Sequence, residues 1–301
     1  MNHQDPPPSS PPPGLTWTEE NYRALARFVQ SYSGIIMERV AQKGVRERLT
    51  QHIQSLGISS IDDYLLLLQS PKSAALRGEL ISLITVSESY FFRNPDQFRY
   101  IARTLLPRLA ANRQELGLRR EIRVLSAGCS TGEETYSLAA ICLWFQRRHP
   151  DLAITVVGAD INPRNVELAR AGIYRDRSFR QVSRDLRHEF GFPLYREIPE
   201  GYAVEEELRR FVQFKTLNLK DPDALKCHAG SDIIMCRNVL IYFEETFRNA
   251  LLQTFQGLLN PGGMLFLGET ESLAAVPAGF ELVPCLRAYG YRKLHPSGHT
   301  P

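Results

Sequence analysis

The sequence predicts an α/β protein in which helices cover both faces of a mainly parallel sheet. From residue 121 onwards, short apolar runs alternate with helix-length segments, and this alternation is typical of a parallel sheet. From 16 to about 92, apolar residues recur at helical spacing instead, which predicts a small all-helical domain. Between about 175 and 213, turn residues and alternating apolar positions predict a small antiparallel β insertion.

Four helices are expected in the N-terminal domain. Thr16 and Glu19 have the spacing of a capping box, so the first helix is expected to begin there. The second helix is expected over 45–56, the third behind a Ser60 cap, and the fourth over 76–84. Four short helices in about 70 residues would form one small domain.

In the α/β part, the expected elements follow one another in a regular order. Strands are predicted at 122–128, at 154–160, at the start of 232–243, at 264–269 and at 287–294. Helices are predicted at 135–145, 162–172 and 246–259, and the sequence NPGG at 260–263 is expected to form a turn.

These patterns divide the chain into four parts. The first residues read MNHQDPPPSSPPPG and contain no apolar run that could enter a core. The predicted parts are a disordered Pro-rich tail (1–15), the helical domain (16–92), the α/β domain with its insertion (93–295) and a second tail (296–301).

The composition is that of an ordinary globular protein, with 43% hydrophobic and 23% charged residues. The net charge of +3 is too small to indicate nucleic-acid binding, and no apolar run approaches the roughly 20 residues that a membrane span needs. Five cysteines without metal-type spacing are expected to be reduced thiols in a cytoplasmic protein. The histidines show no ligand spacing either, so no metal site is expected.

A glycine-containing loop follows the first predicted strand. Gly128 and Gly132 leave room for a ligand to approach the backbone, and the next helix presents its N-terminus there. The second strand ends in Asp160, 28 residues after Gly132. An acidic side chain at this place commonly binds the two ribose hydroxyls of a nucleotide. The pattern therefore predicts a ligand that contains a nucleoside, although a tight strand-to-helix turn alone would use the same glycines.

The charge of the loop narrows the choice of nucleoside. No lysine follows Gly132, so the loop is not a Walker-type phosphate loop. Glu133 and Glu134 stand where a pyrophosphate site would avoid negative charge. The cationic sulfonium and ammonium groups of S-adenosylmethionine (SAM) suit these carboxylates better. Of the two, Glu134 is expected to be a helix N-terminal charge rather than a ligand contact.

Three longer stretches resemble the CheR family of SAM-dependent methyltransferases, which esterify glutamates of bacterial chemotaxis receptors. The stretches are TVSESYFFRNPDQF (85–98), SAGCSTGEETYSLA (126–139) and CRNVLIYF (236–243). The resemblance runs in order from about Trp17 to Leu294. It implies a Rossmann-like SAM-dependent methyltransferase sheet, SAM as cofactor and S-adenosylhomocysteine as product.

The resemblance also implies roles for individual residues. Ser87 and Ser89 occupy positions where the family commonly has Asn and Thr, and both keep a polar group. Arg93 is implied as a cofactor contact that also orients the acceptor, and Tyr242 as a second catalytic residue, although it could equally be a core aromatic. The other implied cofactor-binding residues are Gly128, Glu133, Asp160, Asn218, Leu219, Asn238 and Val239.

The implied partner is the cytoplasmic domain of a methyl-accepting receptor. Methylation sites on acidic helical bundles would suit a basic surface of the helical domain. The candidate residues there are Arg39, Lys43, Arg46 and Arg48. In the family, the β insertion can also bind a C-terminal peptide of some receptors.

Two other functions stay open from the sequence. A regulatory protein could keep the SAM pocket and have little turnover. A methyltransferase could also act on another acceptor, such as RNA or a small molecule, although the near-neutral charge and the lack of a basic, aromatic stripe weigh against RNA.

Overall fold

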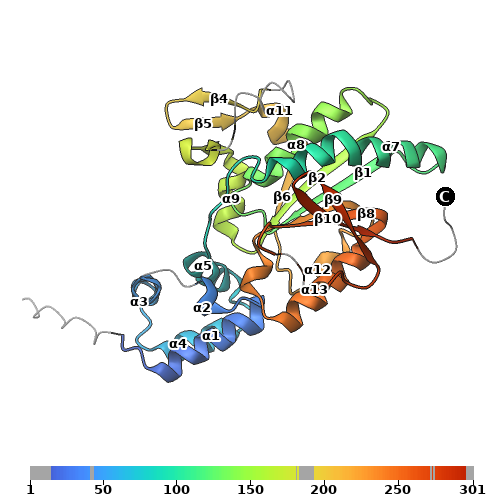
Figure 1. The fold of residues 1–301 in the computed structure, drawn as a ribbon. Helices are drawn as coiled ribbons and strands as arrows, with labels where there is room; N and C mark the ends of the chain where they lie inside the picture. The colour runs from blue at the N-terminus through green and yellow to red at the C-terminus, as the bar shows by residue number, and fades with distance from the viewer. Residues whose placement is uncertain are drawn as a thin grey trace, which may run out of the picture.

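The structure is a computed structural model that describes residues 15–40, 44–180, 182, 193–271, 273 and 275–295. A helical unit forms the lower left of Figure 1, and it packs beside an α/β unit built on a seven-stranded sheet. Most of both predicted tails and Lys43 lie outside the described residues. The predicted fold class, an α/β methyltransferase sheet with an N-terminal helical part and a small β insertion, is confirmed.

The helical unit contains the four expected helices and one more short helix. The helices are α1 (Glu19–Ser33), α2 (Met37–Val40), α3 (Val45–Ser55), α4 (Ile61–Gln69) and α5 (Ala74–Ile84). Ser60 caps α4 by accepting a hydrogen bond from the Asp63 amide, as predicted. The predicted capping box at Thr16 and Glu19 is wrong, because Thr18 caps α1 and exchanges hydrogen bonds with Asn21.

The large sheet has the strand order β6-β2-β1-β7-β8-β10-β9. The strands from β6 to β8 are parallel to their neighbours, whereas β10 runs antiparallel to both β8 and β9. The strands are β1 (Glu121–Ala127), β2 (Ala153–Asp160), β6 (Val212–Thr216), β7 (Ser231–Cys236), β8 (Leu259–Leu267), β9 (Phe280–Cys285) and β10 (Ala288–Lys293).

Alternate residues of the central strands feed two separate hydrophobic cores. On β1, Val124 belongs to one core and Leu125 to the other, and Met235 and Cys236 on β7 divide in the same way. The first core is covered by α7 (Leu106–Glu115), α8 (Glu133–Gln146) and α9 (Pro163–Ala171). The second core is covered by α12 (Pro222–Lys226) and α13 (Glu245–Leu258), and it continues into the helical unit.

Several elements were not expected. Strands β6 and β9 were not predicted, nor was the helical segment of α6 (Pro95–Tyr100), a π-helical turn (Ile101–Leu105) and α7. The π-helical turn lies just before Pro107, whose missing N–H interrupts regular helix hydrogen bonding. The predicted NPGG turn is wrong, because 260–263 lie within β8, where a register shift opposite Ser231 and Ile233 accommodates them.

The β insertion is smaller than predicted. It is a three-stranded antiparallel sheet of β3 (Ile173–Tyr174), β5 (Gly201–Val204) and β4 (Tyr195–Ile198), with a 3-10 turn at Asp176–Phe179. The last residues of the expected range form α11 (Glu206–Phe211) and the start of β6, which belongs to the large sheet.

The sheet has a topological switch point between β1 and β7. From β1 the chain proceeds to β2 and β6 on one side, and from β7 it proceeds to β8 on the other. Ligands of open α/β sheets bind in the crevice beyond the carboxyl ends of the strands at such a point. The loops that follow β1, β2 and β7 therefore converge on one site.

Candidate functional site

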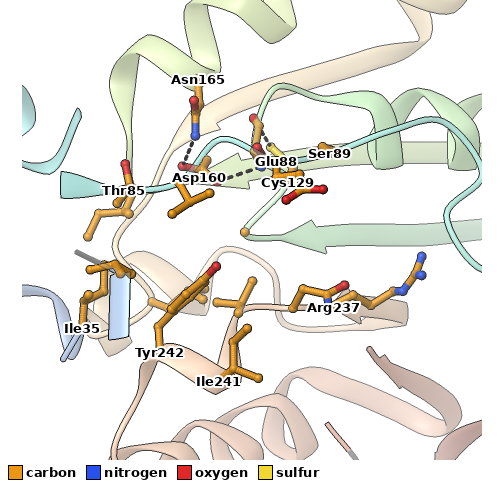
Figure 2. Close-up of a pocket in the computed structure, with 18 of the residues that line it drawn as sticks. Ile35, Thr85, Glu88, Ser89, Cys129, Asp160, Asn165, Arg237, Ile241 and Tyr242 are labelled. Atoms are coloured by element: carbon orange, nitrogen blue, oxygen red, sulfur yellow. Dashed lines mark hydrogen bonds between the residues drawn. The ribbon is translucent and has the colours of Figure 1, made fainter. Parts of the chain in front are cut away.

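A cavity of about 290 Å³ lies at this edge of the sheet, as Figure 2 shows. Its walls come from the loops after β1, β2, β6 and β7, from the segment 85–93 and from the helical unit. The predicted residues that line it are Ser89, Arg93, Gly128, Asp160, Asn218, Leu219, Asn238, Val239 and Tyr242. Ser87 and Glu133, which were also predicted, are not part of the lining.

Asp160 is fixed at the end of β2 by three hydrogen bonds. Its carboxylate accepts from the amides of Ser130 (2.8 Å) and Asn162 (2.9 Å) and from the Asn165 side chain (3.3 Å). Burial raises the pKa of Asp160, and these donors partly oppose the rise. In Figure 2, Asp160 and Asn165 face Tyr242 and Ile241 across the cavity. The carboxylate is thus a rigid acceptor for ligand hydroxyls.

Gly128 lets the loop after β1 approach the loop after β7. Its φ is +78°, and a Cβ there would lie 2.4 Å from Cγ2 of Val239. Val239 itself lines the cavity. The glycine is therefore needed for this close approach of the two loops, whereas the sequence pattern predicts a ligand next to its backbone.

A Gly128→Ala variant is expected to lose about 1–3 kcal/mol of unfolding free energy and to bind SAM more weakly, because Val239 must move into the cavity. Gly57 is a matched control, since its φ is +71° and no atom lies within 4 Å of a Cβ there. Chemical denaturation and ligand titration of both variants would measure the two effects. Equal losses for Gly128→Ala and Gly57→Ala would show that only backbone strain matters.

The two glutamates that begin α8 lie on different sides of the loop after β1. The Glu133 side chain is buried and accepts hydrogen bonds from Thr131 (2.7 Å) and Ser178 (2.9 Å), so it ties the loop to the start of the insertion. Glu134 lines the cavity instead and accepts a hydrogen bond from Ser126 (2.8 Å). Of the two glutamates, only Glu134 is part of the cavity lining.

Arg237 is a buried cation beside Glu134. One guanidinium nitrogen lies 3.4 Å from the Glu134 carboxylate, and another donates to the Arg93 carbonyl at 2.6 Å. Burial raises the pKa of Glu134, whereas Arg237 and the hydrogen bond from Ser126 lower it. This pair links the loop after β7 to both the α8 terminus and the segment that carries Arg93.

Glu271 fixes the loop after β7 through hydrogen bonds from backbone amides. Its buried carboxylate accepts from the amides of Asn238 (2.6 Å), Gly268 (2.9 Å) and Ile241 (3.2 Å). Asn238 has a φ of +59°, which this clamp stabilises. The same loop continues into a 3-10 turn at Leu240–Tyr242, so Glu271 also places Tyr242. Neither Glu271 nor Arg237 was predicted from the sequence.

Arg93 lies between two residues with left-handed backbone conformations. Phe92 has a φ of +53° and Asn94 a φ of +57°. The Phe92 amide donates to Ser137 on α8 (2.9 Å), which anchors the segment. The Arg93 guanidinium lies 5.3 Å from the centre of the Tyr90 ring, and both side chains line the cavity. The half-buried Arg93 is therefore a cation available at the cavity wall.

Ser87 acts on the site only through Asn165, because its hydroxyl and the Asn165 side-chain oxygen lie 2.6 Å apart. Asn218 lines the cavity while its side chain donates to the Tyr32 carbonyl of α1 (2.7 Å). The side of the cavity formed after β6 is thus joined directly to the helical unit.

The basic residues predicted to bind a partner lie in two different places, at the cavity wall and on the surface of the helical unit. Arg39 donates to the carbonyls of Phe243 (2.6 Å) and Ile241 (3.3 Å), on either side of Tyr242. Arg46 pairs with Glu19 (3.3 Å) and stacks on Tyr22. Arg48 donates to the Leu83 carbonyl. Arg39 therefore braces the cavity wall, whereas Arg46 lies on the surface of the helical unit.

The described residues do not support thiol catalysis, a metal site or a membrane span. Burial raises the pKa of the Cys129 thiol well above its usual range, so this lining residue is not a reactive thiolate. Within the described residues, no three His, Cys, Asp or Glu side chains gather where they could hold a metal ion. None of the helices in the described part of the chain is long and apolar enough to cross a bilayer.

The site fits a nucleoside-containing cofactor. A buried carboxylate follows β2, a glycine follows β1, and the hydroxyl oxygen of Ser130 in the cavity wall is buried without a partner in the structure. Together with the strand order, these features are typical of nucleotide-binding α/β proteins. Glu134 at the N-terminus of α8, where a phosphate site would avoid negative charge, favours a cationic cofactor such as SAM.

Comparison with known proteins identifies the family. Residues 87–289 match the CheR methyltransferase SAM-binding domain, and residues 20–85 match the CheR methyltransferase all-alpha domain. The chain belongs to the CheR methyltransferase family. This confirms the predicted enzyme class, a SAM-dependent methyltransferase, and the predicted cofactor.

Curated relatives agree over most of the chain. A chemotaxis protein methyltransferase of Vibrio parahaemolyticus is 34% identical over 275 residues, which make up 90% of this chain and 96% of the relative. Chemotaxis protein methyltransferase 1 of Vibrio cholerae is 33% identical over 275 residues, with the same shares. A probable biofilm formation methyltransferase of Pseudomonas aeruginosa is 30% identical over 277 residues, 91% of this chain but 63% of the relative.

Proposed function

We propose that the protein transfers the methyl group of SAM to glutamate side chains in the cytoplasmic domain of chemotaxis receptors, forming methyl esters. The observation that carries this proposal is a cavity with a hydroxyl acceptor at Asp160 and a cation at Arg93, within a chain that matches chemotaxis methyltransferases along 90% of its length. The biofilm formation methyltransferase of Pseudomonas aeruginosa is matched along only 63% of its own length, so a chemotaxis receptor is the better candidate partner.

The lining residues divide naturally between cofactor and acceptor. We assign the ribose hydroxyls to Asp160, the adenine side to Asn218 and Leu219, and the cationic methionine part to Glu134 rather than Glu133. Gly128, Ser89, Asn238 and Val239 complete this wall, and Ser87 supports it through Asn165. When bound, SAM supplies an electrophilic methyl group on a positively charged sulfur.

Methyl transfer to a carboxylate requires little acid–base catalysis by the protein. A glutamate carboxylate has a reference pKa of about 4.3, so it is ionised at neutral pH and needs no general base. Opposite charges are neutralised as the methyl group moves, and a cavity that excludes water favours this. Arg93 orients the incoming carboxylate, and Tyr242 forms the opposite wall with a phenol that is protonated at neutral pH. Positioning is thus the main contribution of these residues.

Methyl transfer from tritiated SAM to a receptor cytoplasmic fragment tests this function. The proposal predicts label that mild base releases as methanol, because methyl esters are base-labile. Binding of SAM without any transfer would favour the regulatory alternative, and base-stable label would point to another acceptor. In either case the proposed function would be wrong.

The parts of the chain suggest where a receptor contacts the enzyme. We propose the division into a helical domain (16–92) and a methyltransferase domain (93–295), with the receptor on the helical domain and the reaction in the cytoplasm. Arg46, Arg48 and Lys43, the last of which lies outside the described residues, remain the candidates for docking an acidic receptor surface. The insertion sheet, in which β4 is an edge strand, is the proposed site for a receptor C-terminal peptide.

Arg39 is expected to act on the cavity rather than on the docked receptor. An Arg39→Ala variant should lower kcat roughly tenfold and weaken SAM binding in the absence of receptor, because the carbonyls around Tyr242 lose their brace. Arg46→Ala is the matched control and should change only the KM for the receptor. If Arg39→Ala changed only the KM for the receptor, Arg39 would be a receptor-docking residue and not a support of the cavity wall.

A further inference from the structure

Two arginines stack on one tyrosine in the wall of the cavity. The guanidinium carbon of Arg180 lies 3.9 Å from the centre of the Tyr90 ring, and that of Arg93 lies 5.3 Å from it. Tyr90 and Arg93 both line the cavity, whereas Arg180, at the end of the 3-10 turn in the insertion, contacts the Tyr90 ring without being part of the lining. The ring thus holds a second cation close to the one that faces the acceptor.

Glu88 forms an ion pair with the second cation, Arg180. Its carboxylate lines the same cavity and lies 2.9 Å from Arg180. Their side chains are 66% and 42% exposed, respectively, so the pair is hydrated and exchangeable. A negative charge at this place opposes entry of an anionic acceptor, unless Arg180 neutralises it or another carboxylate replaces it.

Of the three arginines Arg93, Arg237 and Arg180, two already have a carboxylate partner. Among the described residues, Arg237 is compensated by Glu134 and Arg180 by Glu88. Arg93 makes no ion pair there, and its cation is available to the glutamate that is methylated. A second acidic group of the acceptor would meet Arg180 beside the same tyrosine ring, provided that it displaced Glu88.

We propose that Arg180 is an acceptor-binding residue that exchanges Glu88 for a second carboxylate of the acceptor. The proposal rests on the proposed function and makes it more specific: the preferred acceptor is an acidic segment with two neighbouring carboxylates, one beside Arg93 and one beside Arg180. Tyr90 sets the spacing between the two subsites, because it carries both guanidinium groups. Glu88 fills the second subsite when no acceptor is bound.

A simpler account is that Arg180 only neutralises Glu88. The two accounts differ in a double-mutant cycle, because a neutralising arginine is no longer needed once Glu88 has lost its charge. The variants are R180A, E88Q and R180A/E88Q. The measurements are the Kd of a receptor cytoplasmic fragment with S-adenosylhomocysteine present, the KM of the same fragment, and the Kd of SAM.

For R180A we expect the Kd and the KM of the fragment to rise roughly three- to tenfold, with SAM affinity unchanged and a smaller effect at high salt. E88Q should lower both acceptor constants about two- to threefold, since Arg180 is then free to bind the acceptor. The double variant should recover only the part of the loss that the uncompensated Glu88 charge causes, and should still bind the fragment more weakly than the wild type. If the double variant instead binds like the wild type, Arg180 serves only Glu88 and the proposal is wrong.

Arg147 provides the matched control, because it also forms an exposed ion pair, with Glu207 at 2.7 Å, away from the cavity. R147A should leave all three constants unchanged. A wild type that binds the fragment but transfers no methyl group would disprove the proposed function, and the binding cycle would still decide the role of Arg180. A wild type that binds no acidic fragment would overturn the Arg180 proposal directly.

Discussion

Replacing Arg93 with alanine is expected to lower kcat for methyl transfer at least about 100-fold, while the Kd of SAM changes only a few-fold. The guanidinium lies in the cavity wall without an ion pair among the described residues, so its charge is available to the acceptor. An arginine there orients the carboxylate, yet a very tight pair would reduce its nucleophilicity. Arg93→Lys should therefore recover only part of the rate, because an ammonium cannot bind a carboxylate in bidentate fashion.

The control for this variant is Arg148→Ala. Arg148 also stacks on an aromatic ring, that of Trp144 at 4.1 Å, and it is not part of the cavity. Its removal should leave kcat and SAM affinity unchanged. If Arg93→Ala loses SAM binding and turnover by the same factor, Arg93 holds the cofactor and does not orient the acceptor.

Replacing Asp160 with asparagine is expected to weaken SAM binding roughly 100-fold, since a charge-assisted hydrogen bond contributes about 1.5–3 kcal/mol and the ribose has two hydroxyls. Burial raises the pKa of Asp160, so its charged form is lost at a higher pH than for an exposed aspartate. SAM affinity of the wild type should therefore fall on acidification from neutral pH. The Asp160→Asn variant should lack this fall in SAM affinity on acidification. Calorimetric titrations at several pH values would measure the difference.

Asp232 gives the matched comparison for Asp160. It is also a buried carboxylate on the large sheet, and it pairs with Arg113 (2.6 Å) outside the cavity. Asp232→Asn should lower the unfolding free energy but leave the Kd of SAM unchanged, because a broken buried pair costs stability locally. Equal loss of SAM affinity in both variants would show that the Asp160 effect is only structural.

The sequence predicted those parts of the site that depend on strand ends. Gly128 and Asp160 each follow a buried parallel strand, and the carboxyl ends of such strands meet at one edge. Their positions follow from a local pattern and a general rule. The strands β1, β2 and β7 were themselves predicted because each contains an apolar run, but their order in the sheet was not.

The sequence could not show which of the two glutamates at the start of α8 faces the cavity. Glu133 and Glu134 are chemically identical, and side chains of neighbouring helix residues point about 100° apart. The outcome depends on Ser178 and Thr131, which hold Glu133, and Ser178 is 45 residues distant in sequence. Only the packed insertion decides which glutamate faces the cavity.

The supporting contacts could not be predicted because they join distant segments. Glu271 holds Asn238 across 33 residues, Arg237 meets Glu134 across 103, and Arg39 reaches Phe243 across 204. No local periodicity signals such pairs. Strand β6 was misassigned for a related reason, because its short alternating pattern suits a hairpin as well as an edge strand of the large sheet.

Calorimetric titration of the wild-type protein with SAM and with S-adenosylhomocysteine tests the central claim most directly, namely that the cavity between Gly128, Asp160 and Val239 holds the cofactor. We predict one site per chain for each ligand, with affinity lost in Asp160→Asn and kept in Asp232→Asn. Failure of both ligands to bind the folded wild type, or binding that Asp160→Asn leaves unchanged, would contradict it.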